Sequence, residues 1–194
     1  MDTWVVVLIV LAVLVVLGLV YMATRQKRSE ALKGRFGPEY ERAVEETGDR
    51  KEAEQELRSR EERREKLQIR DLDPAARERY TGTWRETQAR FVDQPQQAVQ
   101  EADALVILVM RDRGYPVDDF EQRAADVSVD HPHVVDNYRA AHNISVANER
   151  GAASTEDLRQ AMVHYRALFE HLLGAPNGAS ADVDPLEQRD TRRL

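Results

Sequence analysis

The most regular pattern in the chain is an uncharged run close to its N-terminus. From Trp4 to Ala23 the sequence reads WVVVLIVLAVLVVLGLVYMA and contains no Asp, Glu, Lys or Arg. A helix of this length rises roughly 30 Å, which matches the hydrocarbon thickness of a bilayer. The pattern predicts a transmembrane anchor over 1–23. Trp4 and Tyr21 are then the interface anchors, because aromatic rings favour the two membrane–water boundaries.

A cleaved signal peptide is the alternative interpretation of this run. Such peptides begin with basic residues, hold about 7–15 apolar residues and end at a site with small side chains. Here Asp2 makes the start acidic, the apolar run is longer, and the bulky Met22 precedes Ala23. A retained anchor is therefore favoured, and a secreted domain released after Ala23 is the alternative.

Basic residues after the run predict its orientation. Between residues 24 and 35 there are five bases and one acid, Glu30. Lys and Arg next to a span remain on the cytoplasmic side. We therefore expect the N-terminus outside, the soluble part in the cytoplasm and the lipid bilayer as a partner, with the bases also able to contact anionic headgroups.

The segment 24–69 is highly charged and predicts a basic juxtamembrane stretch followed by a charged spacer helix. A short helix is expected from Pro38, which suits a first helical position, to near Gly48. Over 50–66, Glu often stands four residues before Arg or Lys, an order that stabilises an isolated helix. A coiled-coil seam there would bury arginines, so a solvated helix is favoured over weak self-association through 50–66.

Amphipathic helices begin near residue 70. Apolar residues recur three and four positions apart, and Gly114, Gly151 and Gly174 follow the three long helices. The helix-start signals are Asp73-Pro74, Gln94-Pro95, Asp118, Asp130-His131-Pro132 and Ser154-Thr155. No stretch alternates with period two. The predicted fold class is all-α: a transmembrane helix, the spacer helix, and a bundle of four or five helices over 70–174.

Two further structural expectations follow from the same pattern. Trp84 and Tyr138 lie on apolar faces at helical spacing, so we expect them to anchor the core. The segment 175–194 is rich in Pro, Gly, Asp and Ser and lacks an apolar face, so it is predicted to be a disordered tail.

Composition excludes several classes of function. The chain has no cysteine, which rules out disulfides, thiolate metal sites and cysteine nucleophiles. Its net charge is −7 and its bases alternate with acids, so nucleic-acid binding is not expected. Arg outnumbers Lys 24 to 4, a habit of GC-rich bacterial genomes. The predicted location is the bacterial inner membrane.

Candidate chemistry is sparse. The Asp126–His142 region holds histidines and aspartates, and a membrane-tethered, metal-assisted hydrolase using it is the alternative function. However, the H-E-x-x-H motif is absent, and His133 and His142 lie nine residues apart, about 13 Å along a helix. No nucleotide-binding or nucleophile motif is present either. We therefore predict no catalytic residue, no metal, no cofactor and no enzymatic activity.

The richest polar segment joins two of the predicted helices. Its aromatic and charged residues are typical of contact surfaces. The candidate interaction surface consists of Arg111, Arg113, Tyr115, Asp118, Asp119, Phe120 and Arg123. The alternative is a helix–helix turn in which Tyr115 and Phe120 fill the core, and this alternative is favoured.

One family resemblance is visible. The stretches RGYPVDDFEQRAADVSVDHPHVVDNYRAAH and STEDLRQAMVHYRALFEHLL resemble a group of uncharacterised bacterial proteins with one N-terminal membrane span. The resemblance extends from about Phe36 to Leu173. It implies a bacterial membrane protein but no activity and no functional residues. The sequence thus predicts a single-pass, membrane-anchored cytoplasmic module that binds or scaffolds another protein.

Overall fold

The computed structural model describes residues 3–174, apart from the side chains at 3, 5–10, 15, 18, 20, 21, 23 and 25. Two predictions concern parts outside this description: the role of the Tyr21 side chain and the nature of the tail 175–194.

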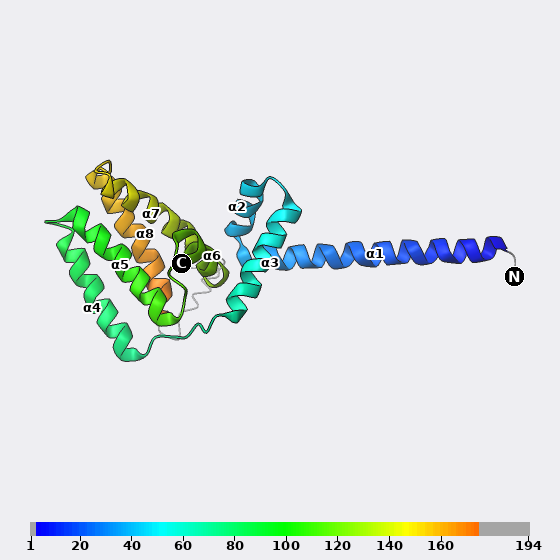
Figure 1. The fold of residues 1–194 in the computed structure, drawn as a ribbon, viewed down its shortest axis with the longest axis horizontal. Helices are drawn as coiled ribbons and strands as arrows, with labels where there is room; N and C mark the ends of the chain where they lie inside the picture. Colours follow the sequence, from blue (N-terminus) through cyan, green and yellow to red (C-terminus); the bar gives the residue numbers. More distant parts are fainter. Residues whose placement is uncertain (1–2, 175–194) are drawn as a thin grey trace, which may run out of the picture.

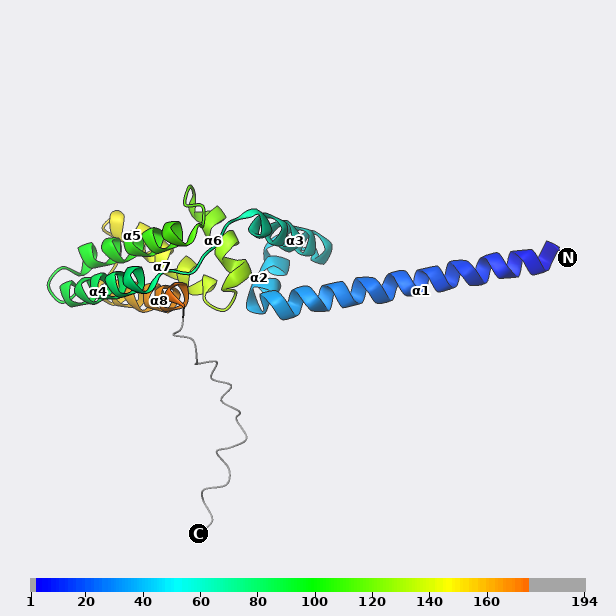
Figure 2. The ribbon, with the colours of Figure 1, turned by 90° about the horizontal axis from the view of Figure 1, so that it is seen from below.

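The described residues form eight helices and no strand, which confirms the all-α prediction (Figure 1). In chain order they are α1 (Thr3–Phe36), α2 (Pro38–Thr47), α3 (Arg50–Lys66), α4 (Pro74–Arg90), α5 (Pro95–Arg113), α6 (Phe120–Asp130), α7 (Val135–Glu149) and α8 (Thr155–Leu173). Helices α4 to α8 form the bundle, and α6 is the bundle helix that lies next to the α2–α3 pair (Figures 1 and 2).

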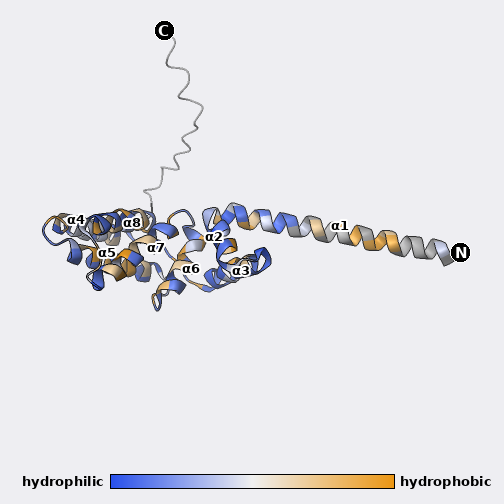
Figure 3. Cartoon of the chain, turned by 90° about the horizontal axis from the view of Figure 1, so that it is seen from above, coloured by the Kyte–Doolittle hydropathy of each residue, from blue (hydrophilic) through white to orange (hydrophobic). Residues whose placement is uncertain are grey.

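Helix α1 is one uninterrupted helix that extends away from the rest of the chain (Figure 2). Among the coloured residues of this helix, Figure 3 shows apolar ones in its outer half and polar ones where it approaches the other helices. Within the part of the chain that the structure describes, no helix combines the length and the apolarity of a membrane span.

The core of the bundle is a single apolar cluster supplied by α4 to α8 and the segments between them. Trp84 is 5% exposed and stacks on Phe169, with ring centroids 4.8 Å apart, and Tyr138 is fully buried. Both predicted core anchors are confirmed. Aromatic pairs of this kind contribute beyond the area that they bury.

The helix ends follow local signals, with two shifts. The side chains of Asp73 and Ser154 cap α4 and α8, as expected. Asp119, rather than Asp118, caps α6. Helix α7 begins at Val135, later than the Asp130 signal predicts, because the Asp130 carboxylate binds elsewhere, as described below.

A second, smaller apolar cluster joins the end of α1 to α2 and α3. Its members are Leu32, Phe36, Tyr40, Ala43, Ala53, Leu57 and Val129. The prediction of a solvated spacer helix is wrong for α3. Ala53 and Leu57 are fully buried against α1 and α2, so the apolar positions that self-association through 50–66 would need are already covered. We call residues 24–66 the N-terminal unit.

Replacing Trp84 with Ala should destabilise the bundle by about 3–5 kcal/mol, because a fully packed aromatic side chain leaves a cavity. Urea unfolding followed by circular dichroism measures this free energy. Val92→Ala, at an 83% exposed position, is the control and should have little effect. Equal effects at the two positions would contradict the packing of Trp84 in the core.

Candidate functional site

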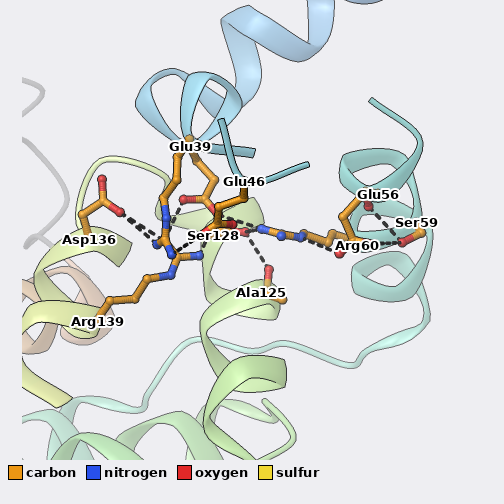
Figure 4. Close-up of polar contacts among 10 residues, drawn as sticks. Glu39, Glu46, Glu56, Ser59, Arg60, Ala125, Ser128, Asp136 and Arg139 are labelled. Atoms are coloured by element: carbon orange, nitrogen blue, oxygen red, sulfur yellow. Dashed lines mark hydrogen bonds and ion pairs between the residues drawn. The ribbon is translucent and has the colours of Figure 1, made fainter. Parts of the chain in front are cut away.

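The most elaborate polar site of the described chain surrounds Glu39 in the first turn of α2. Glu39 is 1% exposed, and two guanidinium groups hold its carboxylate (Figure 4). Arg60 on α3 donates to Oε1 at 2.7 Å. Arg139 on α7 donates through both terminal nitrogens, each at 2.7 Å. Charge-assisted, two-point contacts of this kind are the strong ones among hydrogen bonds.

The surroundings fix the ionisation of Glu39. Burial by itself would raise its pKa, but the hydrogen bonds and charges of Arg139 and Arg60 outweigh burial and hold the pKa below its ordinary value. Asp136 also accepts from Arg139 at 3.1 Å, and Glu56 accepts from Arg60 at 3.1 Å. The two arginines therefore share more than one carboxylate.

Arg60 also connects α3 to α6. Its Nη1 donates to Ser128 Oγ at 3.3 Å, and that hydroxyl donates to the carbonyl of Ala125 at 2.7 Å. Ser128 is fully buried. A hydroxyl suits this place because it can accept from the guanidinium and donate to the backbone at once.

Asp126 on α6 is buried with incomplete hydrogen bonding. Its Oδ1 lies 3.3 Å from Arg63 Nε and accepts from Gln122 at 2.8 Å. Its Oδ2 is buried and has no hydrogen-bond partner. Burial raises the pKa of Asp126 above its ordinary value, although the charge of Arg63 and the Gln122 hydrogen bond oppose this shift.

Asp130 forms the third link between α3 and α6. It accepts from Arg64 Nε at 2.5 Å and from the Tyr115 hydroxyl at 2.6 Å. Three arginines of α3 therefore each contact a different residue of α6. We call the whole set the ionic seam: Glu39, Arg60, Arg63, Arg64, Asp126, Ser128, Asp130 and Arg139.

The predicted interaction surface is largely occupied within the fold. Tyr115 and Arg123 are buried, Arg123 donating to the Tyr138 hydroxyl at 3.0 Å, so burial removes both from any surface that a partner touches. Arg113 donates to the Leu172 carbonyl at 2.9 Å.

Of the other members of that predicted surface, two have contacts within the fold and two are exposed to solvent. Asp119 caps α6, and Phe120 stacks on His142 with ring centroids 3.6 Å apart. Arg111 and Asp118 are exposed, so the prediction of partner contact stays open for these two positions.

The histidines of the Asp126–His142 region do not converge. His131 faces His171 with ring centroids 6.0 Å apart, and His142 stacks on Phe120 instead. Among the residues that the structure describes, no group of three or more His, Asp or Glu side chains is placed to hold a metal ion. The hydrolase alternative gains no support from this geometry.

Glu39 and Arg139 carry no signal in the sequence that marks them as a site. The two residues are 100 positions apart, and each looks like an ordinary surface charge in its own helix. Comparison with protein-family models, curated proteins and solved structures finds no match to this chain. The family resemblance noted in the sequence therefore remains a prediction.

Replacing Glu39 with Gln should destabilise the protein by about 3–5 kcal/mol, because it leaves two buried guanidinium groups without their shared anion. Urea unfolding measures the loss. Glu156→Gln is the matched control, since it removes a carboxylate that binds Arg159 on the exposed face of α8, and it should barely shift the midpoint. Similar midpoints for the two variants would contradict the central role of Glu39.

His131 predicts a pH dependence of stability. Burial, with the charge of Arg113 acting in the same direction, lowers the pKa of His131 to about 4. The unfolded chain, with a pKa near 6.5, therefore binds the proton more readily, and stability falls as pH drops from about 6.5 towards 4. The contribution of His131 is at most about 3 kcal/mol.

Urea unfolding between about pH 7 and pH 4.5 tests this expectation. His131→Gln should show a smaller loss of stability than the unsubstituted chain across that range. His133→Gln, at an exposed position, should keep the full loss. Identical pH profiles for His131→Gln and the unsubstituted chain would show that His131 contributes nothing.

Proposed function

We propose that this protein is anchored in the bacterial inner membrane by residues 1–23 and holds its helical bundle in the cytoplasm, where it binds another protein. The observation that carries the proposal is the contrast along α1. This helix continues unbroken from Thr3 to Phe36. Leu32 and Phe36, near its end, are buried.

The outer part of α1 presents apolar side chains to its surroundings. Each of its large apolar side chains that the structure describes before residue 23 is more than half exposed. They are Trp4, Leu11, Val13, Leu14, Val16, Leu17, Leu19 and Met22. A helix that is apolar on all sides needs an apolar environment, and with the twenty uncharged residues of the sequence this favours a bilayer.

Hydrogen bonds among α1, α2 and α3 join the proposed anchor to the N-terminal unit. Ser29 on α1 donates to Glu54 on α3 at 2.5 Å, and the Tyr40 hydroxyl on α2 donates to the same carboxylate at 3.0 Å. Ser29 lies six residues after Ala23, about 9 Å along the helix. The N-terminal unit thus starts close to the proposed membrane surface, without a flexible linker.

The proposed binding role rests on two exposed residues near the end of α5. Arg111, in the last turn of α5, and Asp118, between α5 and α6, are exposed members of the predicted interaction surface, and Arg is enriched at the centres of protein interfaces. A bundle held near the membrane by the N-terminal unit presents such residues to membrane-associated partners. We therefore propose a scaffold rather than an enzyme.

Cell fractionation tests the anchor. The full chain should remain in membranes after an alkaline wash, and Leu14→Arg with Leu17→Arg should shift it to the soluble fraction, because each charge at mid-span costs about 2.5–3.5 kcal/mol. The control is Leu108→Arg, at an exposed position on α5, which should leave the chain in membranes. Unsubstituted protein in the soluble fraction would contradict anchoring.

Orientation is tested by reporters fused after Leu194. Green fluorescence without periplasmic phosphatase activity is expected if the C-terminus is cytoplasmic. Strong phosphatase activity would reverse the proposed topology. A mature N-terminus after Ala23, found by mass spectrometry, would favour the secreted alternative.

A further inference from the structure

The contact between the N-terminal unit and the bundle is dominated by charge. Each of the two bodies has an apolar cluster of its own. Within the described residues, Val129 is the one bundle residue that belongs to the cluster of the N-terminal unit. The ionic seam joins the two bodies, with the Arg42–Asp136 ion pair and the close approach of Gly37 to the His133 ring beside it. Apart from Val129, separation would leave each apolar cluster within its own body.

We propose that the ionic seam is a latch with two states. In the closed state, which the structure shows, α3 rests on α6, and Arg139 binds Glu39. In the open state the N-terminal unit separates from α6 and α7 and stays tied to the bundle by residues 67–73. This proposal does not depend on the membrane anchor, since it concerns only α1 to α3 and their contact with the bundle.

The energetics of buried charge favour two accessible states. Removing charges from water costs free energy that their mutual attraction only about repays, so a buried ionic contact binds less strongly than an apolar contact of the same size. Separation leaves each apolar core within its own body, and opening returns the charges to water. Relative motion is the ordinary expectation for units joined by a polar interface.

Polar groups without hydrogen-bond partners within the seam also oppose the closed state. Asp126 Oδ2 and Arg139 Nε are both buried without a hydrogen-bond partner. Arg63 Nε is near Asp126 but outside hydrogen-bond geometry. Buried polar groups without partners oppose the closed state, because water would satisfy them in the open state.

The hinge is defined by the segment between α3 and α4. Backbone N–H of Arg70 donates to the Arg113 carbonyl at 2.8 Å, which fixes this point to the end of α5. Gly114 has φ 94°, and a Cβ there would lie 2.5 Å from the Gln68 carbonyl oxygen. The segment from Gln68 onward is therefore packed against the end of α5. Rotation on opening is therefore confined to the residues just after Lys66.

Opening would uncover two complementary stripes. Arg60, which is 10% exposed in the closed state, would face solvent, and Arg63 and Arg64, already 39% and 25% exposed, would lose their partners on α6. Asp126 and Asp130 on α6 would face solvent as well. Either stripe then becomes able to bind a group of opposite charge, which is how an outside partner would compete with closure.

Thiol reactivity tests the latch, because the natural chain has no cysteine. Ser128→Cys places a thiol in the seam, and Ser145→Cys places one in a buried position of α7, away from the seam. The full chain in detergent micelles is treated with iodoacetamide. Each rate is divided by the rate for the same variant unfolded in guanidinium, which corrects for differences in the intrinsic reactivity of the two thiols.

The latch predicts that the thiol at 128 reacts about tenfold or more faster than the thiol at 145. Adding Arg139→Met should raise the rate at 128 by about another tenfold or more and leave the rate at 145 unchanged. Raising salt from about 0.05 M to about 1 M should act in the same direction, because salt stabilises separated charges. Arg159→Met, which breaks an exposed ion pair of α8, should change neither rate.

Equal protection of the two thiols, or equal acceleration by Arg139→Met, would overturn the latch, since global unfolding exposes both sites together. Val129→Cys is a second probe of the same contact and guards against a local disturbance at position 128. It must behave as the thiol at 128 does. Failure of the membrane proposal would appear instead in fractionation, so the two outcomes are distinct.

Discussion

The arrangement of the described chain depends on the burial of one carboxylate, that of Glu39, between two guanidinium groups. An isolated anion would not remain buried, so Arg60 and Arg139 must both be in place when α2 lies against the bundle. These arginines belong to α3 and α7, and the contact therefore fixes the N-terminal unit relative to the bundle. The apolar clusters stabilise each body, whereas the ionic seam sets the position of one body relative to the other.

Local signals predicted the helices well because they act over a few residues. The caps at Asp73 and Ser154 satisfy backbone N–H groups of their own first turns, and the burial of Trp84 and Tyr138 follows from spacing along one helix. The start of α7 was misplaced because Asp130 binds Arg64 and the Tyr115 hydroxyl rather than capping. Asp130 is the last residue of α6, and its carboxylate contributes to the contact with α3 and not to the start of α7.

The seam itself could not be predicted from the sequence. Helix α3 has arginines and glutamates on every face, so its pattern does not show which face will be covered. Its i, i+4 pairs suggested a solvated helix, and some of them do form, as between Arg60 and Glu56. The same Arg60 also reaches Glu39 on another helix, a contact that depends on tertiary arrangement alone.

The continuity of α1 has a geometrical consequence if its outer part is held in a membrane. A helix turns by about 100° and rises about 1.5 Å with each residue. The number of residues between Ala23 and Ser29 would therefore determine the direction, within the membrane plane, in which the N-terminal unit and the bundle closed onto it face. Inserting two residues there would turn the bundle to nearly the opposite side, whereas inserting seven would restore its direction and lift it by about 10 Å. The number of residues in this short segment thus sets the rotation of the bundle about the axis of α1.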